Sequence, residues 1–168
     1  GAHDWHVIVD TGHSPEHACL YCADLKLLIS GDQVLPRISS NVSIHPTEPD
    51  ADPMREWLES LAKLKREVPD DVLVLPSHNE CFHGLHARLD YLAAAQGRTL
   101  DRLRRTLQEP RRAIDVFAAL FGRGIDQSDT GLLNLATGES LACLNYLWHR
   151  GEVRRWLDAP GVAWYQMG

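Results

Sequence analysis

The chain has 168 residues, of which 44% are hydrophobic, and its formal charge at pH 7 is −6. This length allows one domain with a sizeable core, or one domain plus a small appendage. The acidic balance argues against nucleic-acid binding by the whole chain, and no apolar run approaches the ~18 residues of a membrane helix. Residues 1–97 carry a net charge of −8 and residues 98–168 a net charge of +2, which predicts two parts divided there.

The first part has short apolar runs and one long polar loop. The loop, at residues 33–52, is longer than most connections and is a candidate wall of a binding site. Asp52 and Pro53 form a helix-start signal, and the apolar residues from Met54 to Leu64 recur at helical spacing, which predicts an amphipathic helix. The apolar runs predict β-strands at 6–10, 18–22, 26–29 and 72–75.

The second part is mostly helical by its apolar spacing. Two strands are expected at its end, on either side of a turn at 158–161 with hairpin chemistry. Helices followed by a two-stranded wing predict a winged-helix-like module over residues 98–168. The expected helices cover 85 to about 92, a new helix after Gly97 with a possible cap at Thr99, Pro110 to Gly122, and about 137–149.

The four cysteines show no spacing typical of a disulfide framework, so we expect reduced thiols. Cys19 and Cys22 form a CxxC pair inside a predicted strand, without a second pair to complete a zinc site, and are interpreted as core residues. The N-terminus also lacks the basic-then-apolar layout of a signal peptide. Together these features predict a cytoplasmic protein without a membrane anchor.

Three of the predicted strands lead into a residue of a metal-ligating type. His13 follows the first run in Thr11-Gly12-His13, Asp32 follows the third in Ser30-Gly31-Asp32, and His78 follows the fourth in Pro76-Ser77-His78. Strand ends at one edge of a sheet would bring these side chains together, and divalent metals bind such nitrogen and oxygen donors. The pattern therefore predicts His13, Asp32 and His78 as metal ligands.

In this order the three motifs resemble the C-terminal half of a metallo-β-lactamase-superfamily hydrolase, and glyoxalase II-like members are the nearest suggestion. The resemblance covers residues 5 to about 92 and implies an α/β fold, part of an αββα sandwich. It implies two divalent metal ions, zinc before iron or manganese, with His13 and His78 as terminal ligands. Asp32 would bridge the ions and orient a metal-bound hydroxide that attacks an ester, thioester, lactone or related bond of a small-molecule substrate.

The HxHxDH motif, which in that family supplies further metal ligands, has no counterpart in this sequence. A catalytic zinc ion usually has three protein ligands plus water, so the chain holds half a site. We therefore expect a fragment that binds metal weakly or not at all and is inactive without the missing N-terminal half. Strands lacking their partners would expose apolar surface, which favours a homo-oligomer or association with that half.

Two other functions stay open. The arginines of residues 98–168 would suit a nucleic-acid-binding winged-helix protein, although the interleaved acidic residues argue against nucleic acid as a partner. A non-catalytic structural or assembly protein is the other possibility. The remaining histidines near the motifs are interpreted as structural rather than as groups that assist the site: His17, His45, His83 and His86.

Overall fold

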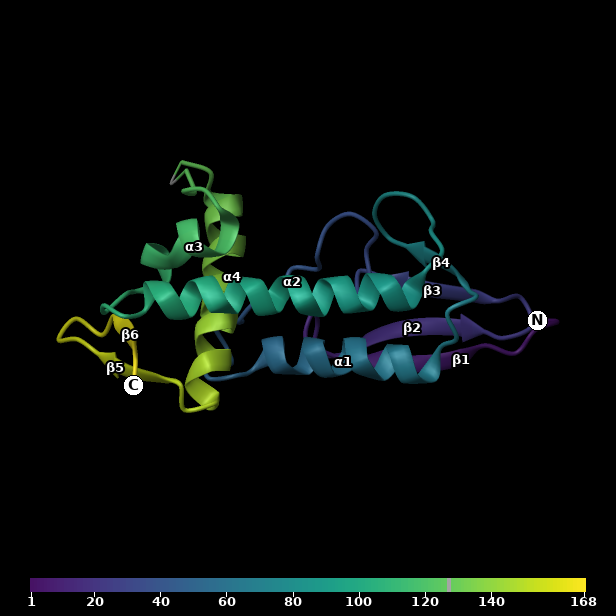
Figure 1. Ribbon diagram of the computed structural model, residues 1–168, viewed down its shortest axis with the longest axis horizontal. Coiled ribbons are helices and arrows are strands. Elements are labelled where there is room, and N and C mark those ends of the chain that lie inside the picture. Colours follow the sequence, from purple (N-terminus) through teal and green to yellow (C-terminus); the bar gives the residue numbers. More distant parts are fainter. Residues whose placement is uncertain (127) are drawn as a thin grey trace. The chain divides into compact units, whose positions relative to one another are not determined.

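The computed structural model describes residues 1–126 and 128–168 (Figure 1). The chain forms two compact units. Unit 1 consists of residues 1–41 and 55–94, and unit 2 of residues 42–54 and 95–168. Each unit therefore contains two separate stretches of sequence, and the domain boundary expected after residue 97 stays a prediction.

Unit 1 contains a four-stranded sheet with the order β1-β2-β3-β4. Its strands are β1 (His6–Asp10), β2 (His17–Cys22), β3 (Leu27–Gly31) and β4 (Leu73–Pro76), close to the four predicted runs. β2 is antiparallel to both of its neighbours, and β3 is parallel to β4. Consequently β1, β3 and β4 run in the same direction, and their C-terminal ends share one edge with the start of β2.

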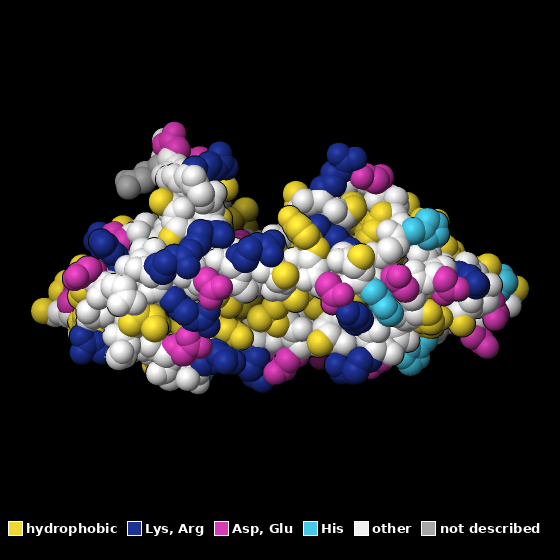
Figure 2. Space-filling model, in the orientation of Figure 1, with side chains coloured by type: hydrophobic (Ala, Val, Ile, Leu, Met, Phe, Trp, Pro, Cys, Tyr) yellow, Lys and Arg dark blue, Asp and Glu magenta, His cyan; other side chains and the backbone are white. Residues whose placement is uncertain are grey.

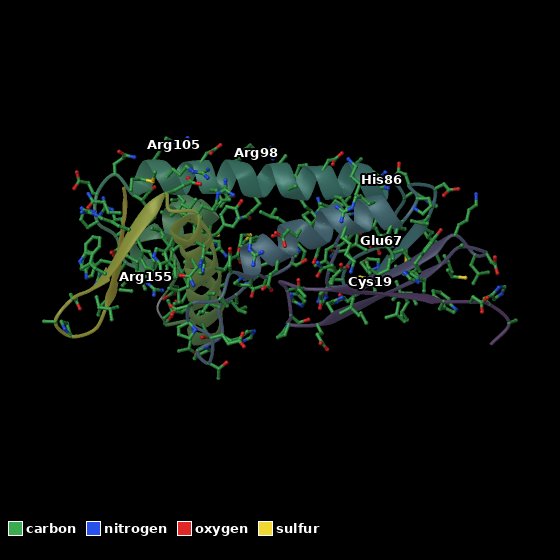
Figure 3. The ribbon with its side chains drawn as sticks, turned by 90° about the horizontal axis from the view of Figure 1, so that it is seen from below. Cys19, Glu67, His86, Arg98, Arg105 and Arg155 are labelled. Atoms are coloured by element: carbon green, nitrogen blue, oxygen red, sulfur yellow. The ribbon has the colours of Figure 1, made fainter. Side chains whose placement is uncertain are left out.

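The two faces of this sheet differ in burial. Ile8, Cys19 and Leu28 point to one face and are each at most 1% exposed. Val7 and Val9 alternate with these residues on β1 and remain about half exposed on the other face, at 53% and 48%. The helices of unit 1 lie on the buried side, as the view in Figure 3 shows.

Helix α1 (Pro53–Glu67) starts at the proline that the sequence indicated. Its apolar residues Met54, Trp57, Leu61 and Leu64 are each at most 2% exposed, which confirms the amphipathic helix. Helix α2 (Leu85–Thr106) runs without interruption, so the expected break at Gly97 is wrong. The Thr99 hydroxyl donates to the Ala95 carbonyl within this helix instead of capping a new one. A glycine costs a helix only about 1 kcal/mol relative to alanine, which burial of the flanking leucines outweighs.

Unit 2 contains a short 3₁₀ helix and two α-helices after α2. The helix expected from Pro110 begins only at Ala113, because the backbone of Arg111 pairs with that of Tyr165. It ends as expected at Gly122, whose φ is 69°. These elements are η1 (Ala113–Val116), α3 (Phe117–Phe121) and α4 (Thr130–His149).

The last helix is longer than its apolar pattern indicated. It begins at Thr130 rather than near Thr137, because the Asp129 side chain accepts a hydrogen bond from the Leu132 N–H and caps it. The C-terminal hairpin of β5 (Val153–Leu157) and β6 (Ala163–Met167) is confirmed. None of the helices in the described ranges has the length and apolarity that crossing a membrane would require.

Candidate metal centre

The three residues predicted from the strand ends meet around one carboxylate in unit 1. His13 Nε2 lies 3.7 Å from Asp32 Oδ2, and His78 Nε2 lies 3.3 Å from Asp32 Oδ1. The side chains are partly open to solvent, with 26% of His13, 34% of Asp32 and 62% of His78 exposed. The structure therefore brings the three together, and their role as metal ligands stays a prediction.

The loop that carries His13 is held against helix α1. The backbone N–H of Thr11 donates to Ser60 Oγ at 3.0 Å. Gly12 has a φ of +101°, and a Cβ atom there would lie 2.5 Å from the backbone nitrogen of Trp57. Only glycine permits both this conformation and this close approach, so the turn before His13 depends on Gly12.

Asp32 is fixed by hydrogen bonds to its side chain and to its backbone. Ser77 Oγ donates to the Asp32 carboxylate, and Ser40 Oγ donates to the Asp32 carbonyl. The Ser77 N–H also donates to the carbonyl of Gly31 at 3.1 Å, which ties the end of β4 to the end of β3. The carboxylate therefore has a defined position between the two imidazoles.

The protonation of His13 follows from its other ring nitrogen. His13 Nδ1 lies 2.8 Å from the carbonyl oxygen of Asn41, and a carbonyl can only accept a hydrogen bond. The proton is therefore on Nδ1, and in a neutral imidazole the Nε2 lone pair is free next to Asp32. A histidine whose second ring nitrogen donates to a carbonyl is the usual arrangement of a metal ligand.

A fourth side chain at this edge is His17, which was interpreted as structural. It begins β2, and its Nε2 lies 3.2 Å from the backbone nitrogen of Asp32. Its ring centroid is 5.9 Å from that of His13. Burial and the neighbouring His13 lower the pKa of His17. Its position at the start of a strand antiparallel to β1 was the sequence signal that could have placed it here.

Two of the remaining histidines bond to main-chain carbonyls of unit 1. His83 Nδ1 lies 3.0 Å from the Val72 carbonyl oxygen, and His86 Nε2 lies 2.8 Å from that of Val68. These contacts agree with the structural interpretation. His45 belongs to unit 2 and is exposed.

The donor set fits a divalent metal by chemistry but falls short in number. Two imidazoles and a carboxylate suit zinc and similar ions, yet a single carboxylate serves both imidazoles. Each imidazole with the shared Asp32 provides two ligands, whereas a catalytic zinc ion usually has three. Within residues 1–126 and 128–168, no group of three or more His, Cys, Asp or Glu side chains is arranged to hold a metal ion.

Two family models match this chain. The model described as "Metallo-beta-lactamase superfamily" matches residues 1–78, and the model "Metallo-beta-lactamase-like, C-terminal domain" matches residues 100–168. None of the curated proteins compared with the sequence matches it.

Solved structures are similar over the whole chain. A beta-lactamase domain protein from Burkholderia ambifaria is 39% identical with a TM-score of 0.92, over 100% of this chain and 49% of its own. A metallo-beta-lactamase family protein from Thermus thermophilus is 25% identical with a TM-score of 0.82, over 99% of this chain and 50% of its own. The chain thus spans about half the length of these two proteins.

Proposed function

This chain belongs to the metallo-beta-lactamase superfamily, and we propose from that premise that it is one half of a metal-dependent hydrolase. The observation that carries the proposal is the approach of His13 and His78 to the two oxygens of Asp32, at 3.7 and 3.3 Å. The substrates we propose are esters, thioesters, lactones or related small molecules, as in glyoxalase II-like members of the superfamily.

The residues at the sheet edge would hold two divalent ions in this proposal. His13 with Asp32 would contribute to one and His78 with Asp32 to the other, with zinc ahead of iron or manganese for such mixed donors. The chemistry that such ions would supply there is polarisation of the scissile carbonyl and a lowered pKa, towards ~7, of a bound water. Ser77 and Ser40 would keep Asp32 in place, and the Asn41 carbonyl would keep the Nε2 lone pair of His13 available.

We assign the missing ligands to residues outside these 168. The support is the shortfall of ligands for each ion, together with the coverage of only about half of two similar structures. On this view the chain alone binds metal weakly or not at all and is inactive.

The same missing half is the partner we assign to the outer sheet face, defined as Val7, Val9 and Ile29. These side chains are 53%, 48% and 37% exposed and lie on the same face of the sheet, on β1 and β3, which flank β2. Apolar patches of this kind in soluble proteins usually mark an interface. In the absence of the other half, two copies of the chain would associate through this face.

Nucleic-acid binding by residues 98–168 is the rival function. The helices and hairpin of unit 2 are compatible with a winged-helix-like module, and Figure 2 shows basic side chains, which are all arginines in this part of the sequence, over the C-terminal part of α2. Several arginines of residues 98–168 are engaged in ion pairs, however: Arg104 with Asp101 and Glu152, Arg112 with Asp115, and Arg155 with Asp50. This pairing leaves less charge for phosphates, so we favour the hydrolase.

A chimaera tests the proposal. Residues 1–168 replace the aligned half of the Burkholderia ambifaria protein, and bound metal and hydrolysis of esters and thioesters are measured. We expect metal and turnover in the chimaera, little of either in the chain alone, and loss of both in Asp32→Asn. His45→Gln serves as the control, since this exposed histidine lies in unit 2.

If the chain alone hydrolysed these substrates as fast as the chimaera does, its assignment as half an enzyme would be contradicted. A chimaera that folds but holds no metal would favour the structural or assembly role. Salt-sensitive binding of duplex DNA by the chain would favour the nucleic-acid role.

A further inference from the structure

Both ring nitrogens of His17 are engaged within the protein. The backbone N–H of Asp32 can only donate, so His17 Nε2, at 3.2 Å, is the acceptor of that hydrogen bond. The ring proton is then on Nδ1, which lies 3.8 Å from Cys19 Sγ (Cys19 is labelled in Figure 3). We propose that His17 is a positioning residue that fixes the backbone of Asp32, and that it is not a metal ligand.

His13 and His17 differ in how they use the same tautomer. In His13 the Nδ1 proton is donated to the Asn41 carbonyl, and the Nε2 lone pair stays available beside the Asp32 carboxylate. In His17 the Nε2 lone pair is already used by the Asp32 N–H. The two ring centroids are 5.9 Å apart, yet the rings contact different parts of Asp32. His13 faces the carboxylate of Asp32, and His17 accepts a hydrogen bond from its backbone N–H.

The end of β3 is shaped to receive the His17 ring. Gly31 has a φ of +52°, and a Cβ atom there would lie 2.8 Å from both Cε1 and Nε2 of His17. The imidazole therefore occupies space that any other residue at position 31 would fill. The N–H of Asp32 is held by His17 and its carbonyl by Ser40, so the two main-chain groups of this residue are both anchored.

The role of His17 rests on the proposed function, because the position of Asp32 matters to chemistry only if its carboxylate holds metal. Loss of the Nε2 acceptor would leave the Asp32 N–H unpaired and allow the carboxylate to turn away from His13 and His78. Removing a group that orients a metal ligand usually weakens metal binding by about 10- to 100-fold.

The first test uses the chain itself and needs no metal. In ¹⁵N-labelled protein, the ring nitrogen shifts of His17 should show a protonated Nδ1 and an unprotonated Nε2. A coupling across the hydrogen bond should link Nε2 to the Asp32 amide. A protonated Nε2, or a ring that titrates without moving the Asp32 amide signal, would overturn the assignment.

The second test compares two variants in the chimaera. His17→Phe keeps a ring but removes the acceptor, whereas the side-chain oxygen of Gln in His17→Gln reaches the position of Nε2. We expect zinc affinity to fall about 10- to 100-fold in His17→Phe and to be largely restored in His17→Gln, with His45→Gln as the control. Circular dichroism verifies that each variant is folded.

Two outcomes of the second test would overturn the role of His17. One is an unchanged affinity in His17→Phe, and the other is an affinity in His17→Gln as weak as in His17→Phe. If the unaltered chimaera binds no zinc, the proposed hydrolase function fails, and the nitrogen shifts still decide whether His17 holds Asp32.

Discussion

The carboxylate of Asp10 lies 3.8 Å from the ammonium group of Lys63, yet it is only 1% exposed. Within the described part of the chain, neither oxygen of this carboxylate accepts a hydrogen bond from a nitrogen or oxygen donor, and its other polar neighbour is the Cys19 thiol. Burial raises the pKa of Asp10 to about 6, and the charge of Lys63 only partly opposes that rise. Ionised Asp10 at the end of β1 is therefore a destabilising feature of unit 1 at neutral pH.

Asp10→Asn removes the buried carboxylate, so the stability of this variant and that of the unaltered chain should depend on pH in different ways. A carboxyl group with a raised pKa in the folded state supports stability fully below about pH 4, and this support is lost as the pH rises to about 6. The free energy of unfolding of Asp10→Asn relative to the unaltered chain should therefore increase from pH 4 to pH 7, by roughly 3 kcal/mol at most. Urea unfolding at a series of pH values measures it.

Asp71→Asn provides a control of opposite sign. The exposed Asp71 carboxylate accepts a hydrogen bond of 2.6 Å from Lys26, which lowers its pKa. Ionised Asp71 therefore stabilises the folded state at neutral pH, and this stabilisation is lost as the pH falls through the folded-state pKa of Asp71. Parallel pH profiles for Asp10→Asn and Asp71→Asn would contradict the assignment of a raised pKa to Asp10.

The strand pattern predicted that His13, Asp32 and His78 would lie close together, because each strand can be recognised from its own short stretch of sequence. Each apolar run specified a strand, and the common direction of β1, β3 and β4 then placed His13, Asp32 and His78 at one edge. His17 was missed because its role depends on an approach to the backbone after Gly31, which no spacing in the sequence records. Helix α2 was divided in error because Gly97 is a weak local signal, and burial of residues on either side decided the outcome.

Gly31 and His17 should be energetically coupled. Gly31→Ala places an alanine at a positive φ, with its Cβ atom 2.8 Å from the imidazole of His17. In His17→Ala the imidazole is gone, so the Cβ atom has room. The alanine at position 31 should therefore cost less in the His17→Ala background, with a coupling of about 1 kcal/mol in a double-mutant cycle measured by urea unfolding. Additive costs would show that the ring and the glycine do not constrain each other.

The four cysteines should differ sharply in reactivity. All four are free, but only Cys81 is exposed. Burial raises the pKa of Cys143 to about 12, and burial together with the charge of Asp10 raises the pKa of Cys19. Because the thiolate is the reactive form, a thiol reagent should label Cys81 in the native protein and the other three only after unfolding. Mass spectrometry of labelled peptides identifies the sites, and rapid native labelling of Cys19 would contradict its burial.

Gly12 and Gly84 allow the effect of a close backbone approach to be separated from that of a positive φ. Both are left-handed, at +101° and +83°, but a Cβ atom at Gly84 would meet nothing within 4 Å. At Gly12 it would lie 2.5 Å from the backbone nitrogen of Trp57, and helix α1 cannot yield as a flexible side chain can. We expect Gly84→Ala to lower the free energy of unfolding by about 1 kcal/mol and Gly12→Ala by about 3 kcal/mol. Urea unfolding of the two variants compares these costs. Equal losses would mean that the chain before His13 is not anchored by its contact with α1, and that the turn itself supplies the position of the imidazole.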